Sequence, residues 1–466
     1  MPRTLPMAAV MNRTASAPRT VIVGLGKTGL SCARFLAARD VPLAVTDSRA
    51  QPPGLASLQQ ELPQVAVFME GFNAGILARA EQIVLSPGVS LKEPVIAEAA
   101  RRGIPVLGDI ELFARYAHAP VIAITGSNGK STVTTLVGLM AQRAGLTVRV
   151  GGNLGTPALD LVQDNEPDLY VLELSSFQLE TTSSLNAAAA VVLNITPDHM
   201  DRYATFDEYA RAKQRAYNGD GVMVINADDP TVSAMICPGR RVTRFGLAAP
   251  APDGFGLCNE CGDTWLARGG QLLLAARELR IKGRHNIANA LAALALGDAL
   301  KLPRAAMLDA LREFPGLPHR SQWVAGQDGI DWYNDSKGTN VGATLAALQG
   351  LASADGRQGK IVLIAGGDGK GADFSPLRQA VADYARAVVL IGRDAPIIEA
   401  ALAGAVPVAK ARTMQDAVRA AKEFAQPGDQ VLLSPACASF DMYSGYEERG
   451  HVFVAAVTAC LGSRGG

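Results

Sequence analysis

The stretch APVIAITGSNGKSTVTTLVGLM, residues 119–140, decides the architecture of this chain. A strand-like apolar run ends in a turn of small residues, and a helical pattern follows directly. Small residues let backbone N–H groups approach phosphate oxygens, and the N-terminus of the next helix adds its dipole. Lys130 can reach the β- and γ-phosphates of a nucleotide, and the Ser131 hydroxyl can bind Mg²⁺. Ile124 stands where the full phosphate-loop pattern has its first glycine, so an incidental Gly-rich turn is the alternative.

The same order of apolar run, Gly-rich turn and helical pattern recurs along the chain. It appears in RTVIVGLGKTGLSCARFLAARD (19–40) and again after KIVLIAGGDGK (360–370). Strands that alternate with helices predict an α/β fold whose parallel sheets are covered on both faces. We expect a loop or small β excursion at 246–272. The expected division is a loose tail at 1–18 and domains at 19–108, 109–316 and 317–466.

Composition sets limits on the class of protein. The chain has 466 residues, and Lys+Arg and Asp+Glu both number 44. At roughly 150 residues per domain, this length fits about three domains. A net charge of zero gives no reason to expect a nucleic acid or an anionic membrane as partner. Because no signal peptide or span of about 20 apolar residues is evident, we expect a cytoplasmic protein. We also expect a monomer.

The six cysteines do not form the pattern of a disulfide framework. Cys258 and Cys261 make a CxxC, but a structural zinc needs four ligands and no second CxxC or HxxxH accompanies it. We therefore expect no zinc there. Cys437 has no histidine near it in sequence, and a small buried thiol is the expected reading.

Gly24-x-Gly26-x-x-Gly29 follows the first apolar run, and Asp47 ends the next one. Taken alone, this pattern is typical of an NAD-binding unit. The same geometry holds any pyrophosphate, however, and a plain strand–helix packing turn is a third reading. We prefer a second nucleotide-like ligand with Asp47 facing it.

Carboxylates and a histidine follow the phosphate-loop-like turn. Glu173 lies at the end of one apolar strand, and the run 194–202, which contains His199, follows another. Carboxyl ends of parallel strands face the crevice where α/β sheets bind ligands, and Mg²⁺ needs only one or two protein ligands besides phosphate and water. His199 could bind a second cation or orient substrate. Lys213, on an expected helix, reads by itself as a solvated lysine.

At GSNGKST, VLELSSFQLE, NITPDHMDRY, HNIANALAAL, GLPHR, NDSKGTN, GGDGKGADF and SPACASFDMY, in this order, the chain resembles the Mur ligases of peptidoglycan synthesis. The resemblance runs from about residue 19 to about 455. It implies a Rossmann-like UDP-binding domain, a central P-loop-type ATPase-like domain and a Rossmann-like C-terminal domain for the amino acid. It also implies ATP and two Mg²⁺ ions, no NAD, and UDP-N-acetylmuramoyl-L-alanine and D-glutamate as substrates, joined through an acyl-phosphate.

The resemblance assigns roles to particular residues. Those implied for the UDP substrate are Thr28, Asp47, Ser48, Arg49, Ser86, Asn153, Ser175 and His199. Those implied for ATP are Gly126, Ser127, Asn128, Gly129, Lys130, Ser131, Thr132, Asn286, Asn289, Arg320 and Asp335. Those implied for D-glutamate are Lys337, Thr339, Lys370, Ser439, Phe440 and Tyr446.

The implied catalytic residues are Lys130, His199 and Lys213, and the implied metal ligands are Ser131, Glu173, His199 and Lys213. The last aligns with a lysine that family members carbamylate, which would turn a cation into an oxygen ligand. Lys27 stands where relatives have an apolar residue. Three alternatives remain: a Mur-type ligase for another amino acid, an NAD-dependent oxidoreductase, and a non-catalytic nucleotide-binding regulator.

Overall fold

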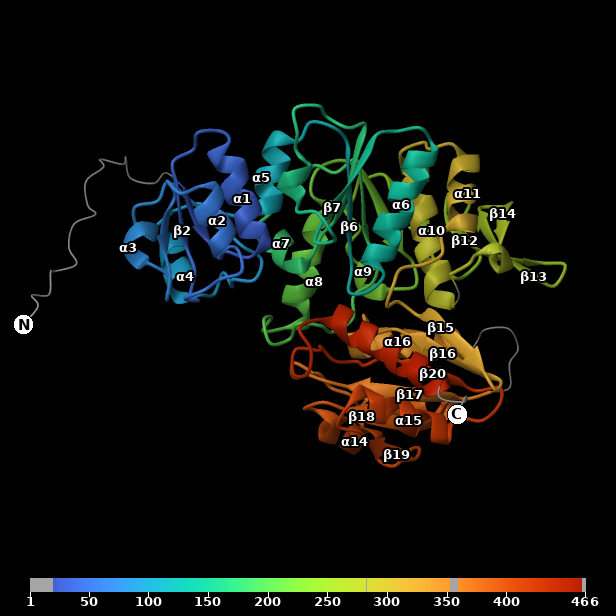
Figure 1. Ribbon diagram of the computed structural model, residues 1–466. Coiled ribbons are helices and arrows are strands. Elements are labelled where there is room, and N and C mark those ends of the chain that lie inside the picture. The colour runs from blue at the N-terminus through green and yellow to red at the C-terminus, as the bar shows by residue number, and fades with distance from the viewer. Residues whose placement is uncertain (1–19, 282, 353–358, 463–466) are drawn as a thin grey trace, which may run out of the picture. The chain divides into compact units, whose positions relative to one another are not determined.

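The computed structural model describes residues 20–281, 283–352 and 359–462, so the tail predicted at 1–18 lies outside these ranges. Three separate sheets follow one another along the chain (Figure 1). The described residues form two compact units. One runs up to Ala117 and also includes Thr156–Asp164 and Thr181–Ser183; the other contains the rest. Within the described residues, no helix has both the length and the apolarity to cross a membrane.

The first sheet has five parallel strands in the order β3-β2-β1-β4-β5. They are β1 (Thr20–Val23), β2 (Leu43–Thr46), β3 (Ala66–Phe68), β4 (Gln82–Leu85) and β5 (Val106–Leu107). The helices of this unit are α1 (Lys27–Ala37), α2 (Leu55–Glu61), α3 (Ala74–Leu77), α4 (Pro94–Arg101), α5 (Asp109–Tyr116) and the 3₁₀ turn η1 (Ala158–Leu161).

The second sheet has nine strands in the order β14-β13-β12-β11-β10-β9-β6-β8-β7. They are β6 (Val121–Thr125), β7 (Val148–Gly152), β8 (Leu169–Glu173), β9 (Ala189–Val192), β10 (Val222–Asn226), β11 (Val242–Phe245), β12 (Phe255–Glu260), β13 (Asp263–Arg268) and β14 (Gln271–Ala275). Its helical elements are α6 (Lys130–Arg143), α7 (Ser176–Glu180), α8 (Phe206–Gln214), η2 (Arg215–Tyr217), α9 (Pro230–Ser233), η3 (Ala276–Glu278), α10 (Arg284–Ala299) and α11 (Arg304–Glu313).

The third sheet has six strands in the order β15-β16-β20-β17-β18-β19. They are β15 (Gln322–Gln327), β16 (Ile330–Asn334), β17 (Ile361–Gly366), β18 (Ala385–Ile391), β19 (Val408–Lys410) and β20 (Gln430–Leu433). Its helices are α12 (Val341–Ala352), α13 (Leu377–Tyr384), α14 (Ala395–Leu402), α15 (Met414–Phe424) and α16 (Tyr446–Gly462).

Antiparallel pairs extend two of the sheets, which the expectation of parallel sheets did not include. β12 pairs with β13 across the turn Cys261–Gly262, and β15 pairs with β16 across Asp328–Gly329. All four turn residues have positive φ, between 52° and 84°, as a two-residue hairpin turn requires. Such a turn needs no helical crossover. The β excursion expected at 246–272 is confirmed as the hairpin of β12 and β13.

Buried parallel strands explain the continuous apolar runs of the sequence. In β17, Ile361, Leu363 and Ala365 pack with α12, α13 and α14, whereas Val362 and Ile364 pack with α15 and α16. Both faces of this strand are therefore covered, and every one of its residues is buried. This packing is the reason that an alternating polar pattern is absent there.

The candidate site residues lie at the carboxyl ends of neighbouring strands. β6, β8 and β9 are adjacent and parallel, so the turn 126–129, Glu173 and the run 194–202 meet at one edge of the second sheet. β16, β20 and β17 are likewise adjacent and parallel. They bring the loops 335–340, 434–441 and 367–370 to one edge of the third sheet.

The turn between β1 and α1 generates a stability prediction. A Cβ at Gly29 would lie 2.0 Å from the carbonyl oxygen of Gly24, whereas a Cβ at Gly26 would have no atom within 4 Å. Gly29→Ala should lower the free energy of unfolding of the first unit by about 2–3 kcal/mol through overpacking. Gly26→Ala should cost less than about 1 kcal/mol, the scale of a helix N-cap change. Denaturant unfolding of both variants checks this, and equal losses would contradict it.

Candidate active site

The phosphate-loop-like turn connects β6 to α6, and its shape depends on two glycines. Gly126 and Gly129 have φ of 144° and 85°, values that residues with a Cβ rarely adopt. A Cβ on Gly129 would also lie 2.4 Å from Asn289 Oδ1. Lys130 opens α6, and its Nζ donates to the carbonyl oxygens of Gly126 (2.9 Å) and Ser127 (3.0 Å). The lysine therefore folds back over the turn whose backbone would receive phosphate.

Asn194, at the end of β9, holds this turn in place. Its Oδ1 accepts the backbone N–H of Asn128 (2.8 Å), and its Nδ2 donates to the carbonyl oxygen of Asn128 (3.1 Å). The Asn194 carbonyl oxygen accepts the backbone N–H of Ser127 (2.9 Å). The Ser127 hydroxyl donates to the Thr196 carbonyl (2.9 Å) and accepts the Thr196 N–H (2.9 Å). Two segments far apart in sequence are thus locked together.

Lys213 is buried rather than solvated, so the reading from its residue type alone was wrong. Thr205 caps the N-terminus of helix α8 with its hydroxyl, which accepts the N–H of Glu208 (3.2 Å). Lys213 lies with Tyr209 among the buried residues of this helix. The side chain is 2% exposed. Its Nζ donates to the Gly126 carbonyl (2.9 Å) and lies 4.7 Å from the centre of the Tyr209 ring. Burial, and then the charge of Lys130, lower the pKa of Lys213 well below its ordinary value.

Glu173 ends β8 and has an oxygen available for a cation. Asn153 Nδ2 donates to its Oε1 (2.7 Å), while Oε2 is buried and accepts no hydrogen bond. Although burial acts to raise it, Lys130 and hydrogen bonds hold the pKa of Glu173 below its ordinary value. A buried, ionised oxygen without a donor is a suitable ligand for Mg²⁺.

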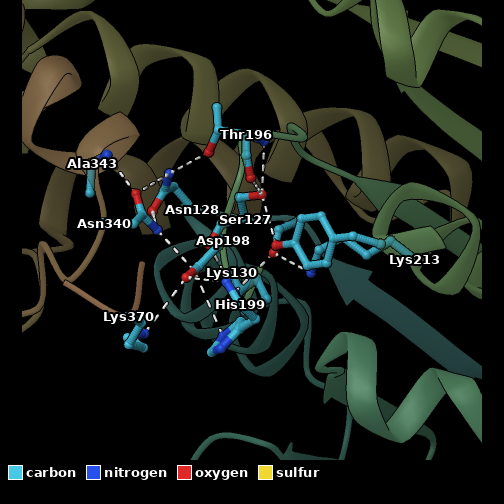
Figure 2. Close-up of polar contacts among 12 residues, drawn as sticks. Ser127, Asn128, Lys130, Thr196, Asp198, His199, Lys213, Asn340, Ala343 and Lys370 are labelled. Carbon is cyan, nitrogen blue, oxygen red and sulfur yellow. Dashed lines mark hydrogen bonds and ion pairs between the residues drawn. The ribbon is translucent and has the colours of Figure 1, made fainter. Parts of the chain in front are cut away.

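His199 follows β9 with φ of 57°. Its ring meets Phe177 edge to face at 4.8 Å, and its Nε2 lies 3.7 Å from Asp198 Oδ2. Burial lowers the pKa of His199 to about 4 against the opposing effect of Asp198. The imidazole is therefore neutral at physiological pH, the form that binds a metal ion or accepts a proton. Asp198 lies beside it at the centre of Figure 2.

Residues predicted for ATP surround one cavity of about 280 Å³. Its lining includes Asn128, Gly129, Thr132, Asn286, Asn289, Arg320 and Asp335. Arg320 also donates to the Ser131 hydroxyl (2.7 Å). Burial raises the pKa of Asp335 to about 6. Lys337, which was assigned to D-glutamate, lines the same cavity.

The residues predicted for D-glutamate lie on loops of the third sheet, and they are not all together. Lys337 Nζ lies 3.6 Å from the centre of the Tyr446 ring. Paired hydrogen bonds between Asp368 and Ala438 join the Lys370 loop to the Ser439 loop. Lys370 Nζ faces Asp198 Oδ1 at 3.7 Å (Figure 2), and Ser439 is buried. Phe440, by contrast, is 75% exposed, and Thr339 donates its N–H to the Lys337 carbonyl (2.8 Å).

The residues predicted for the uridine nucleotide lie in the first unit. Asp47 accepts hydrogen bonds from the N–H of Leu25 (2.7 Å) and from the guanidinium of Arg49 (2.7 and 2.9 Å). Despite burial, these contacts lower the pKa of Asp47 to about 2. Ser86 donates to the Gly24 carbonyl (2.7 Å), while Thr28 is half-buried and Ser48 exposed. Asn153, Ser175 and His199, predicted for the same substrate, belong to the other unit.

Comparison with known proteins identifies the family of this chain. Three family models match in succession: Mur ligase MurD-like N-terminal domain at 18–108, Mur ligase middle domain at 124–297, and Mur ligase glutamate ligase domain at 319–437. The chain belongs to the Mur ligase family. This confirms the predicted family, its three α/β domains and an ATP-dependent amide-bond ligase. The domain boundaries stay predictions.

Individual relatives of this Mur ligase agree with the family models. The chain is 60% identical over 445 residues to UDP-N-acetylmuramoylalanine–D-glutamate ligase of Nitrosococcus oceani, covering 96% of this chain and 97% of the relative. The protein of the same name from Methylococcus capsulatus is 55% identical over 439 residues, 94% of each chain. A UDP-N-acetylmuramate-alanine ligase from Thermotoga maritima shares the fold, with a TM-score of 0.59 at 18% identity over 95% of this chain and 99% of that one.

Some residues of this Mur ligase site had no role in the sequence analysis. Asp198 and Asn194 lie in the run that contains His199, but only their hydrogen bonds reveal what they do. Tyr209 lies four residues before Lys213, a spacing that places both on one helix face, so this signal was present. Its hydroxyl lies 2.9 Å from the Ser127 hydroxyl. No cluster of three or more His, Cys, Asp and Glu side chains suited to a metal occurs in the described residues.

Asn194 generates the prediction for this site. Asn194→Ala removes both side-chain bonds to the backbone of Asn128 and should weaken ATP binding at least about tenfold, because a loosened phosphate loop must be ordered on binding. Isothermal titration of ATP measures this. Asn186→Ala, in the exposed loop before β9, is the control and should bind ATP normally. Unchanged affinity in Asn194→Ala would contradict the role given to Asn194.

Proposed function

We propose that this Mur ligase joins D-glutamate to UDP-N-acetylmuramoyl-L-alanine, with ATP converted to ADP and phosphate through an acyl-phosphate. The observation that carries the proposal is the meeting of the phosphate loop, Glu173, Lys213 and His199 at one sheet edge, beside the cavity with the predicted ATP residues. Relatives at 55–60% identity carry the corresponding name. These relatives match nearly the whole chain. The match includes the third region, the predicted domain at 317–466, where the amino acid would bind.

In the first step, the terminal carboxylate of the UDP substrate attacks the γ-phosphorus of ATP. A C–O–P linkage forms, and the bond from phosphorus to the bridging oxygen breaks as ADP leaves. Lys130 exchanges its two carbonyl partners for phosphate oxygens, and the backbone N–H groups of the turn hold the β-phosphate. Preorganised donors of this kind lower the cost of charge that develops during transfer.

Four residues would hold the magnesium ions: Ser131, Glu173, His199 and Lys213 as its carbamate. The unpartnered Glu173 Oε2 and the neutral His199 ring are the features that fit such a role. Mg²⁺ held by these residues would screen the mutual repulsion of phosphate and carboxylate. The hydroxyl, the carboxylate and the carbamate would offer oxygen ligands, which Mg²⁺ prefers, and the imidazole would offer a neutral nitrogen. This set depends on the modification of Lys213.

The environment of Lys213 supports this modification. Burial and the charge of Lys130 lower the pKa of Lys213 and so favour its neutral amine, and the nitrogen lone pair of a neutral amine can attack CO₂. An N–C bond forms, a proton leaves the nitrogen, and the product is a carbamate anion. The carbamate places a negative charge beside Lys130, which attracts it, whereas the ammonium form of Lys213 would be repelled there.

In the second step, the amine of D-glutamate attacks the acyl carbon, phosphate leaves, and an amide bond remains. The loops of the third sheet would hold the two carboxylates through Lys337, Thr339, Lys370, Ser439, Phe440 and Tyr446. The first unit would hold the uridine nucleotide through Thr28, Asp47, Ser48, Arg49 and Ser86. Asn153, Ser175 and His199 would meet the muramoyl-alanine end.

We also propose that the enzyme works in the cytoplasm as a monomer. The six cysteines, all in the described residues, are free thiols, as is usual in a reducing compartment. A Mur-type ligase for another amino acid is the alternative, because the family fold alone does not select the substrate. Amino-acid choice separates the two.

The choice of amino acid tests the proposed substrate. With ATP and UDP-N-acetylmuramoyl-L-alanine, mass spectrometry should detect the product with D-glutamate. L-Glutamate should react at least about 10²-fold more slowly, since the same carboxylate anchors would turn its amine away. Lys370→Ala should raise the KM for D-glutamate more than that for ATP. Equal use of the enantiomers, or preference for L-alanine or diaminopimelate, would reject D-glutamate and leave the ligase chemistry in place.

A further prediction concerns the carbamate of Lys213. Lys213→Ala should lower kcat at least about 10²-fold, since a group that stabilises transferring charge is lost, and formate should restore part of the activity by occupying the vacated space. Wild-type enzyme with ¹³CO₂ should show a carbamate carbon in NMR spectra. Lys360→Ala removes an exposed lysine and should stay fully active. Full activity of Lys213→Ala without additives would reject a metal-ligand role.

A further inference from the structure

Asn340 has no role in the mechanism above, yet Figure 2 shows it at the left of the polar network, joined to residues from different loops. It ends the loop after β16 and immediately precedes α12, and it is 7% exposed. Its Oδ1 accepts the backbone N–H of Ala343 (2.8 Å), which makes it the N-terminal cap of α12. A cap alone would explain an asparagine at this position.

The same amide also reaches two loops of the second sheet. Its Nδ2 donates to Asp198 Oδ2 (3.0 Å) and to Asn128 Oδ1 (3.3 Å). Its Oδ1 accepts from Asn128 Nδ2 (3.4 Å). Asn128 belongs to the phosphate loop and Asp198 precedes His199. One side chain of the third region therefore contacts both loops that hold the reacting groups.

The hydrogen-bonding capacity of this amide is completely used. An asparagine offers two N–H donors and one oxygen with two lone pairs, and Asn340 makes two donated and two accepted bonds. Its orientation is determined chemically, because the oxygen must face the Ala343 N–H and the nitrogen must face a carboxylate. All four bonds are satisfied together only when α12, the phosphate loop and the His199 loop are correctly placed.

Asp198 passes this constraint on to the reacting groups. Besides Asn340, its carboxylate faces His199 Nε2 at 3.7 Å and Lys370 Nζ at 3.7 Å. Asp198 Oδ1 also accepts the backbone N–H of His199 (2.9 Å), so the two hydrogen bonds divide the carboxylate between them. Asn340 holds Oδ2, the oxygen that faces His199 Nε2. Without that donor, Oδ2 loses this hydrogen bond, and its placement relative to His199 Nε2 loosens although Oδ1 is still held.

We propose that Asn340 is a positioning residue for ligation, which aligns the amino-acid loops of the third region with the phosphate loop and with His199 through Asp198. The proposal rests on the proposed function. It requires the N–H donors of the amide, whereas a capping role requires only the oxygen. The two roles can therefore be separated by a substitution that keeps the oxygen and removes the donors.

Asn340→Asp is that substitution, because aspartate caps a helix as well as asparagine does. It places a carboxylate oxygen against Asp198 where a donor stood. We expect a Tm close to that of the wild type, an unchanged KM for ATP, and a kcat lower by about 10²-fold, the scale of a small misplacement of reacting groups. A kcat within twofold of the wild type would overturn the proposal.

Two further variants make the result specific. Asn186→Asp is the matched control: its Oδ1 accepts the N–H of Asp220 (3.0 Å) in an exposed loop, and it should keep full activity. The double variant Asp198→Asn with Asn340→Asp restores one donor facing one carboxylate at the same net charge. The kcat of the double variant should be about tenfold or more above the kcat expected from multiplying the fold-losses of the two single variants. Strictly multiplicative effects would overturn the proposal.

Failure of the proposed function gives a different result. If the wild-type enzyme forms no product from D-glutamate, the function assignment fails before any variant is compared. If the wild type is active and Asn340→Asp matches it, the function stands and the positioning role of Asn340 is rejected.

Discussion

The carbonyl oxygen of Gly126 accepts hydrogen bonds from two lysines, Lys130 and Lys213, each at 2.9 Å. Two ammonium groups on one buried oxygen repel each other in surroundings that screen charge poorly. Burial and this proximity lower the pKa of Lys213, and burial lowers that of Lys130. Without ligands, the site is therefore an arrangement of cations that favours anions.

This constraint accounts for the chemistry that the site favours. A γ-phosphate gives Lys130 new partners, and loss of the charge on Lys213 removes the repulsion. Glu173 and Asp198 moderate the field of the lysines, and both carboxyl groups keep pKa values below their ordinary range even though burial acts in the opposite direction. The carboxylates thus stay ionised beside the phosphate loop, where oxygen ligands for a cation are needed.

The rigidity of the site comes from pairs of segments rather than from single motifs. Asn194 fastens the phosphate loop to the end of β9, and the Asp368–Ala438 pair fastens two loops of the third sheet. Asn340 links these two groups of loops through Asn128 and Asp198. Each link uses backbone N–H groups, backbone carbonyls or short amide side chains, which have few rotamers and lose little entropy when ordered.

The sequence by itself determined the α/β class, the phosphate loop and the family, because these depend on local order. An apolar run, small residues and a helical pattern are read along the chain, and the glycines at 126 and 129 occur where the backbone needs positive φ. The hairpin at Asp328–Gly329 was also predictable from local sequence, because Asp-Gly between two strands is typical of a two-residue turn. The prediction of parallel sheets did not use this signal. Tertiary structure alone decided the burial of Lys213, the hydrogen bonds of Asn194 and the four bonds of Asn340. Desolvation and hydrogen bonding depend on residues that are distant in sequence. The spacing of Tyr209 and Lys213 places both on one face of helix α8, but it does not show that the turn at Gly126 would enclose the lysine.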